Sequence, residues 1–375
     1  MNGKSNERAG EVSVMMMDGG GQVALPVARC LGQVPGLSLH VVSDEAAVPL
    51  RFSRHRTSFH VRPLATDEQR LAAAHDVIRR VRPDVLLPVL GDDVRFLSQH
   101  AASLPPDVQL APTPSVDAFD TVVNKWRLAQ FLEQQGLPGP ATILYTADDA
   151  FERRLAALTF PVLIKPVRGS SGNGIRQFDT PDALRDALQQ QPDAQGLTIV
   201  QELLPGYDID CSVLCQDGAF LAYTIQRGFM ARPGAFAPPA GIEFVHDEQV
   251  YDVTRRLMAA FGWTGVAHVD LRVDQRDGQV KILEINTRYW TSLEGSLKAG
   301  VNFPHLHVLA GLGVTFPMPD YRPVRFVAWD VGLIQKVRYP RRTRFSLGET
   351  NLRYMLGDPV AEAIRLGLLA KRKFL

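Results

Sequence analysis

Apolar residues in the first third of the chain follow two patterns. Short apolar runs at 11–17, 37–43 and 83–90 predict buried strands, because strands covered on both faces lose the alternation of polar and apolar positions. Between them, 22–34 and 67–81 have apolar positions at the spacing of an amphipathic helix. Buried strands that alternate with helices are typical of a parallel, doubly wound sheet, the α/β class that we predict for this part.

From residue 115 onward the pattern changes to shorter strands and fewer helices. A proline-rich stretch at 104–114 marks the boundary, and a helix is expected over 115–136. Several short strand candidates and two helices follow, which predicts an α+β domain. The expected organisation is a disordered tail at 1–10, a doubly wound domain at 11–114, an α+β domain at 115–316 with subdomains of about 115–196 and 197–316, and an extension at 317–375.

Composition narrows the classes of protein. The chain is 22% charged and 45% hydrophobic, as a globular protein is, and its formal net charge of +1 argues against a nucleic-acid binder. Three cysteines are too few for a disulfide framework in 375 residues. No apolar run reaches the ~18 residues of a membrane helix, and the polar start lacks the apolar centre of a signal peptide. We therefore expect a cytoplasmic protein.

The near-zero net charge is a cancellation between two regions. Residues 320–375 hold 12 basic and five acidic residues, a net charge of +7, which leaves −6 for residues 1–319. A solvated or core-docked cap is the favoured reading of such an extension. Contact with an acidic partner or a membrane surface is the alternative.

The first candidate for chemistry is a lysine at the end of an apolar strand, followed by a loop of small residues. Small residues let backbone N–H groups approach phosphate oxygens, and lysine adds a positive charge for an anion. The order is neither that of a P-loop nor that of a dinucleotide fingerprint, and a plain glycine–serine hairpin is the alternative. The residues are Lys165, Gly169, Ser170, Ser171, Gly172 and Gly174.

Two carboxylates and an amide form the second candidate. Glu284 and Asn286 are two apart on a strand and share a face, and a hairpin-like segment joins their strand to the one with Asp270. Such oxygen ligands suit Mg²⁺, which usually completes its shell with water and nucleotide phosphates. The alternative is that these acids pair with nearby Arg272 and Arg288.

The order of these features resembles the ATP-grasp superfamily over roughly residues 10–316. Lys125 begins a helix, and about forty residues later Lys165 ends a strand before the glycine-rich loop. Then come QELL (201–204), an acid after a turn, a strand aspartate and EINTR (284–288). Within the superfamily the chain is most similar to carboxylate–amine ligases akin to the carbamoyl-phosphate synthase large subunit. The resemblance implies a doubly wound domain followed by a two-subdomain ATP-grasp fold.

The resemblance assigns a nucleotide site. Lys125 and Lys165 would contact the ATP phosphates, with Lys165 also serving catalysis, and the loop at 169–174 would close over them. Asp208 would hold the ribose. The adenine pocket would be lined, mostly through backbone, by Gln201, Glu202, Leu203 and Leu204.

The resemblance also implies a reaction. Asp270, Glu284 and Asn286 would hold one or two Mg²⁺ ions, with Mn²⁺ as an alternative, and Arg288 would face the transferred phosphoryl group. A carboxylate would attack the γ-phosphorus of ATP to give an acyl-phosphate, and an amine would then displace phosphate from the acyl carbon. Cations stabilise the meeting of two anions in the first step. Arg227, after a strand, is expected to clamp the substrate carboxylate.

Other functions stay open at this point. The acyl-phosphate step also serves ammonia, bicarbonate or a thiol as acceptor, and a nucleotide-binding regulatory or assembly protein would share the fold. A nicotinamide oxidoreductase is disfavoured because the glycines at 19–21 lack the dinucleotide spacing. The expected partners are small-molecule carboxylate and amine substrates, without nucleic acid, and a homodimer is an open assembly.

Overall fold

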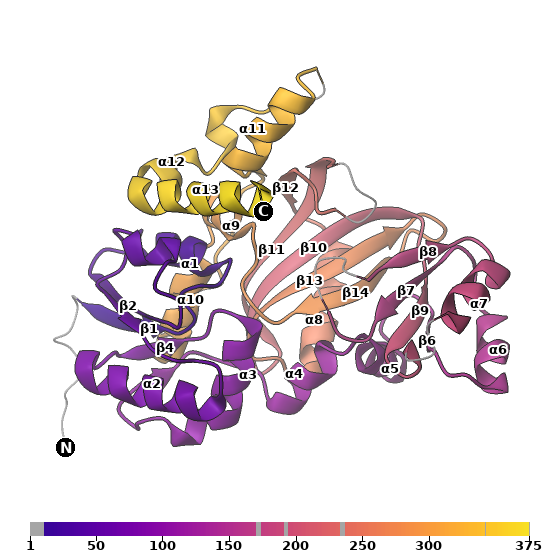
Figure 1. Ribbon diagram of the computed structural model, residues 1–375, viewed down its shortest axis with the longest axis horizontal. Helices are drawn as coiled ribbons and strands as arrows, with labels where there is room; N and C mark the ends of the chain where they lie inside the picture. Colours follow the sequence, from indigo (N-terminus) through magenta and orange to yellow (C-terminus); the bar gives the residue numbers. More distant parts are fainter. Residues whose placement is uncertain (1–10, 170–173, 191–193, 233–236, 342, 375) are drawn as a thin grey trace.

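The computed structural model describes residues 11–169, 174–190, 194–232, 237–341 and 343–374. The tail at 1–10, expected to be disordered, and the loop positions 170–173 lie outside the described residues. Three sheets follow one another along the long axis of the molecule, with the N-terminal sheet at one end and the smallest antiparallel sheet at the other (Figure 1).

The N-terminal region is a parallel sheet covered by helices on both faces, which confirms the predicted doubly wound class. Val14 and Met16 of the central strand pack toward helices α1 and α10, whereas Met15 and Met17 pack toward α2 and α3. In spatial order the strands are β3 (Ser58–Val61), β2 (Leu37–Ser43), β1 (Val12–Met16), β4 (Val85–Leu87) and β5 (Gln109–Leu110). The helices are α1 (Ala24–Leu31), α2 (Asp67–Val81), α3 (Gly91–His100) and α10 (Phe303–Gly311).

The second region contains two antiparallel sheets, and helices cover one face of each. The four-stranded sheet consists of β6 (Thr142–Leu144), β9 (Thr198–Glu202), β7 (Val162–Pro166) and β8 (Arg176–Phe178), covered by α6 (Asp149–Leu155) and α7 (Pro181–Gln189). The six-stranded sheet consists of β14 (Val280–Asn286), β13 (Gly265–Asp274), β10 (Gly206–Gln216), β11 (Ala219–Met230), β12 (Gly241–Val245) and β15 (Arg325–Val327). Its covering helices are α4 (Val116–Val122), α5 (Lys125–Gln134) and α8 (Glu248–Phe261).

Strand alternation divides the six-stranded sheet into an apolar and a polar face. Ile209, Val269 and Ile285, on three neighbouring strands, belong to the core beneath α4, α5 and α8. Residues one position away must point to the opposite face because successive side chains on a strand alternate. The sequence therefore places Asp210, Asp270 and their neighbours together on the face opposite α4, α5 and α8, part of which packs against α10.

The last part of the chain is packed onto both preceding regions. β15 pairs antiparallel with β12, and α13 packs against η1 (Pro49–Phe52) of the N-terminal region. Figure 1 shows α11 (Trp329–Arg338), α12 (Leu352–Leu356) and α13 (Pro359–Phe374) gathered above α1 and α9 (Leu293–Ala299). The short turn η4 (Leu347–Glu349) lies between α11 and α12 in the chain.

Candidate nucleotide and metal site

A row of acidic side chains crosses three adjacent strands on the polar face of the six-stranded sheet. Asp210 on β10 lies opposite Asp270 on β13, and Asp270 lies opposite Glu284 on β14. The amide Nδ2 of Asn286 donates a hydrogen bond to Asp270 Oδ2 at 3.2 Å. The three predicted metal ligands, Asp270, Glu284 and Asn286, are therefore side by side, with Asp210 added to them.

The charges in this row repel one another. Burial, reinforced by the neighbouring charges of Asp210 and Glu284, raises the pKa of Asp270 well above its ordinary value. Burial likewise raises the pKa of Asp210 to about 7. Crowded carboxylates of this kind are stabilised by a cation, and hard oxygen donors are what Mg²⁺ prefers. The residues present thus fit a magnesium site by their donor chemistry and by their mutual repulsion.

Lys125 joins the acidic row to the glycine-rich loop. As the first residue of α5, it follows the N-cap Asn124, whose side chain accepts from two backbone N–H groups. The Lys125 Nζ lies 3.4 Å from Glu284 Oε2 and donates to the Gly169 carbonyl at 2.8 Å. Its backbone N–H donates to the Val167 carbonyl, which fixes the loop stem against the helix. The predicted phosphate and metal motifs therefore meet at Lys125.

Lys165 lies on the neighbouring four-stranded sheet and is held by a short relay of side chains. Its Nζ donates to Gln201 Oε1 at 2.7 Å, and Gln201 Nε2 donates to Thr142 Oγ1 at 2.9 Å. Burial lowers the pKa of Lys165 to about 8, with the charges of Glu284 and Asp270 opposing that shift. The acidic row is therefore close enough to Lys165 to act on its charge.

The residues predicted for the nucleoside lie along the end of β9 and the start of β10. Glu202 accepts the backbone N–H of Thr159 at 2.7 Å, and Leu204 is buried. The guanidinium of Arg272 binds the Leu204 carbonyl at 2.7 Å and pairs with Asp208. Leu203 follows Glu202 and donates its backbone N–H to the Pro161 carbonyl. Asp208 thus pairs with Arg272, one of the two arginines that the sequence offered as alternative partners for the metal-site acids.

Histidine and tryptophan side chains complete the polar face beyond the carboxylates. His268 Nε2 lies 3.5 Å from Asp270 Oδ1 and 3.9 Å from Asp210 Oδ2. Its other ring nitrogen is 2.9 Å from Ser212 Oγ, and its ring stacks on Trp290 with 5.5 Å between centroids. Burial and the charge of Arg288 lower the pKa of His268 to about 3, so the ring is neutral. Arg288 itself donates to the Tyr289 carbonyl at 2.9 Å.

The structure does not bring Arg227 to this face. Arg227 pairs with Glu243 at 2.9 Å. Ile225, two positions earlier on β11 and therefore on the same face as Arg227, belongs to the core beneath α8. The adjacent Gln226 points to the acids instead, because Gln226 Nε2 donates to Asp210 Oδ2 at 3.3 Å. Ser292 Oγ donates to Gln226 Oε1 at 3.0 Å and links this group to the segment after β14. Alternation along 225–227 was the signal by which sequence reasoning could have found Gln226.

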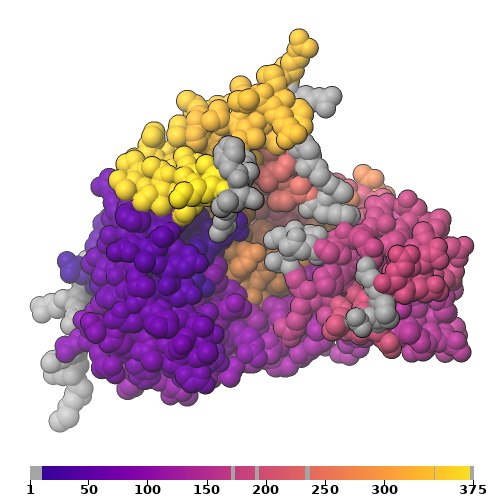
Figure 2. Space-filling model, in the orientation of Figure 1, coloured from indigo at the N-terminus to yellow at the C-terminus, as the bar shows by residue number. Residues whose placement is uncertain are grey.

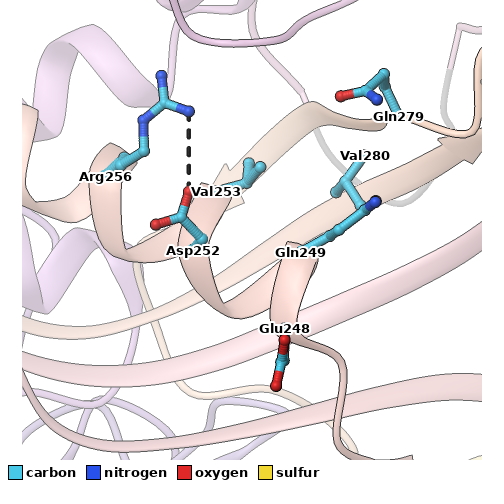
Figure 3. A pocket seen from close by; sticks show the side chains of 7 residues that line it. All are labelled: Glu248, Gln249, Asp252, Val253, Arg256, Gln279 and Val280. Atoms are coloured by element: carbon cyan, nitrogen blue, oxygen red, sulfur yellow. Dashed lines mark ion pairs between the residues drawn. The ribbon is translucent and has the colours of Figure 1, made fainter.

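A surface depression formed by α8 and the start of β14 is separate from this site (Figure 3). It is lined by charged and polar side chains that include Glu248, Asp252 and Arg256, and an ion pair of 3.9 Å joins the last two. Because α8 covers the apolar face of the sheet, this depression lies across the sheet from the acidic row. It contributes nothing to the nucleotide site.

Comparison with known proteins agrees with this geometry. A family model described as the ATP-grasp domain matches residues 122–292. A D-alanine–D-alanine ligase of Gloeobacter violaceus is 31% identical over 220 residues, which are 52% of this chain and 68% of the relative. A D-alanine–D-alanine ligase of Hydrogenovibrio crunogenus is 28% identical over 187 residues, 47% of this chain. The aligned region spans only 57% of that relative's length.

The fold agrees as well. The chain superposes on an N5-carboxyaminoimidazole synthetase of Staphylococcus aureus, solved with ADP, with a TM-score of 0.69. The superposition covers 90% of this chain and 89% of that chain at 13% identity, so it shows a shared fold. The fold and the arrangement of lysines and acids define a nucleotide-binding class of α/β proteins. The chain belongs to the ATP-grasp family.

Proposed function

We propose that the chain is an ATP-dependent ligase that activates a carboxylate as an acyl-phosphate and couples it to an amine. The observation that carries this proposal is the meeting of Lys125 with Glu284 beside Asp270 and Asn286. This arrangement places a phosphate-binding cation directly against a metal-binding group, as phosphoryl transfer requires. A regulatory protein would have no need of the full set of ligands.

Lys125 and Lys165 bind the ATP phosphates in this proposal. Asp270, Glu284 and Asn286 would hold Mg²⁺, which would neutralise negative charge on the phosphates and on the transferred group. The segment 201–204 lines the adenine, and Asp208 binds the ribose after exchanging its Arg272 partner for hydroxyl groups. The loop predicted to close over the phosphates, 169–174, includes positions 170–173, which lie outside the described residues.

The reaction has two steps that need no covalent enzyme intermediate. A substrate carboxylate oxygen attacks the γ-phosphorus, and ADP leaves as the acyl-phosphate forms. The amine nitrogen then bonds to the acyl carbon, phosphate leaves, and the nitrogen loses a proton. Arg288 stabilises negative charge on the transferred phosphoryl group. Gln226 and Ser292 replace Arg227 as the groups proposed to contact the acceptor.

The relatives indicate which substrates to test first. Both relatives named above are D-alanine–D-alanine ligases, so amino acids are the proposed class of carboxylate and amine. The purified chain with Mg·ATP should release ADP and phosphate with at least one pair from a panel of D- and L-amino acids, other carboxylates and ammonia. No turnover with any pair, together with no binding of Mg·ATP, would refute the proposal.

The lowered pKa of Lys165 gives a test of phosphate binding that needs no knowledge of the substrates. We expect the affinity for Mg·ATP to fall as the pH rises above about 8, because the lysine then loses its charge. If only the charged form binds, the dissociation constant rises up to about tenfold for each pH unit above the midpoint. Bound phosphate raises the pKa of the lysine in the complex, so the dissociation constant levels off only above that higher pKa. Calorimetric titration at several pH values measures the effect.

The matched variant is Lys165→Arg, since arginine keeps its charge throughout this pH range. Its affinity for Mg·ATP should stay level where that of the parent chain falls. Lys165→Met should bind weakly at every pH. If the parent and Lys165→Arg gave the same profile, Lys165 would not be a phosphate contact.

A further inference from the structure

Exposed large apolar side chains are concentrated at the C-terminal end of the described chain. Fifteen such side chains occur among the described residues, and nine of them lie between 333 and 369. Single exposed apolar residues are normal on a protein surface, but their accumulation in one segment marks a contact with another molecule. The nine are Leu333, Ile334, Val337, Leu347, Leu356, Val360, Leu366, Leu368 and Leu369.

Helix α11 shows that this exposure has a direction. It buries Gly332 and Gln335, whereas Leu333, Ile334 and Val337 are 46%, 50% and 76% exposed. An ordinary surface helix buries its apolar stripe and exposes its polar residues. Because α11 exposes apolar side chains, its outer face is better suited to contact with an apolar partner than with water.

The charges of the same segment are sorted by sign. Each acid between 321 and 371 is at least half-buried and has a partner within the fold: Asp330 with Arg365, Glu349 with Ser346, Asp358 with Ser53, and Glu362 with Arg29. The exposed charged residues of this segment are all basic. They are Arg322, Arg325, Lys336, Arg338, Arg341, Arg344, Arg353 and Lys371.

An ion pair links α13 to the first turn of α11. Arg365 of α13 pairs with Asp330 of α11 at 3.0 Å, and residues 366–371 of α13 are all exposed. Figure 2 shows this part of the chain in yellow and gold along the top edge of the view, where its gold part projects beyond the rest of the molecule. We define the apolar–basic surface by its α11 and α13 members, which are Leu333, Ile334, Lys336, Val337, Arg338, Leu366, Leu368, Leu369 and Lys371.

We propose that the apolar–basic surface docks on an anionic phospholipid bilayer. Leucine and isoleucine side chains enter the boundary between headgroups and acyl chains, while lysine and arginine bind the phosphates. The net charge of +7 on 320–375 against −6 on the rest of the chain turns this end toward a negative surface. A two-fold dimer through the same patch would instead set like charges against each other. Among the described residues no helix is long and apolar enough to cross a membrane, so the contact is peripheral.

Vesicle flotation with the full chain tests the proposal. We expect binding to phosphatidylcholine vesicles that contain about 30% phosphatidylglycerol, and at least about tenfold weaker binding to phosphatidylcholine alone. Salt at about 0.5 M should weaken the binding because it screens the basic residues. Two variants should each lower the binding at least about tenfold: the triple change Leu333→Ser, Ile334→Ser, Val337→Ser and the double change Lys336→Glu, Arg338→Glu.

The control variant is Val314→Ser with Met318→Ser, since both side chains are exposed but lie outside the apolar–basic surface. It should float as the parent chain does, and all variants should bind Mg·ATP and melt as the parent does. Absence of binding to either vesicle, or equal loss in the control variant, would overturn the proposal. So would a dimer, measured by light scattering, that the triple variant dissociates, because a second copy would then cover the surface. The chain could also bind polyglutamate as strongly as anionic vesicles, with no change in the triple serine variant. That result would assign the surface to an acidic protein and would overturn the membrane proposal.

Discussion

Replacing Glu284 by glutamine is expected to lower turnover at least about 100-fold. The substitution keeps the size of the side chain and removes its charge. It weakens the proposed magnesium site, in which Glu284 lies opposite Asp270, and releases Lys125, whose Nζ lies 3.4 Å from Glu284. Initial rates of ADP release with an active substrate pair measure the loss. The Mg²⁺ concentration that gives half-maximal rate should also rise.

A matched control lies across the same sheet. Glu243→Gln makes the same chemical change, but Glu243 pairs with Arg227 and Arg325 away from the acidic row. Its turnover should stay within about twofold of the parent value, since an exposed ion pair contributes little. Unchanged turnover in Glu284→Gln would refute the metal assignment. An equal loss in Glu243→Gln would show that the sheet, rather than the site, had been damaged.

The sequence was sufficient for the parts of the fold that follow from local periodicity. Buried runs alternating with helices predicted the doubly wound sheet, and the parallel pairing of β1 with its neighbours confirms it. The two-residue period placed Glu284 and Asn286 on one face. Pairing with β13 then set Asp270 opposite Glu284.

The sequence alone could not predict which residues strand pairing brings to the acidic row. Asp210 reaches the acidic row only because β10 lies between β13 and β11, which no local pattern reveals. The same pairing brings Gln226 to Asp210 and leaves Arg227 on the other face. A shift of one residue along a strand exchanges its two faces. Arg227 is one position from Gln226, the residue that faces the acidic row.

The packing of the C-terminal extension depends on contacts of even longer range. Arg29 on α1 donates to Glu362 on α13, 333 positions away in the chain. A net charge of +7 indicated a basic surface, and the structure shows how it arises. Asp358 and Glu362 are buried in the fold and most of the described basic residues lie outside, although Asp320 at the start of the segment is exposed.

Replacing Arg29 by methionine is expected to destabilise the fold by about 3–5 kcal/mol. Arg29 is 2% exposed and lies among three buried carboxylates: 3.4 Å from Glu294, 3.8 Å from Asp358 and 2.7 Å from Glu362. Methionine fills a similar volume and leaves Glu294 and Asp358 without a cation, whereas Glu362 keeps Arg365 at 2.6 Å. Glu294 lies in α9, which follows β14 closely in the chain. The loss of its partner therefore also loosens the segment between them, which carries Ser292.

The pH dependence of this loss has a definite sign. Burial already raises the pKa of Glu294 with Arg29 in place, and removal of the arginine charge raises it further. A carboxyl group whose pKa is raised on folding favours the folded state only while it is protonated. The deficit of Arg29→Met should therefore be largest near neutral pH and should shrink as the pH falls toward the unfolded value of about 4.3.

Thermal and denaturant unfolding of the full chain at pH about 5 and about 7.5 measure both effects. The exposed Arg79 on α2 supplies the control, since Arg79→Met should change stability by less than about 0.5 kcal/mol. Adding Glu294→Gln to Arg29→Met should recover part of the loss, because one uncompensated charge is then removed. A deficit in Arg29→Met that is independent of pH and unaffected by Glu294→Gln would mean that packing, rather than buried charge, makes Arg29 necessary.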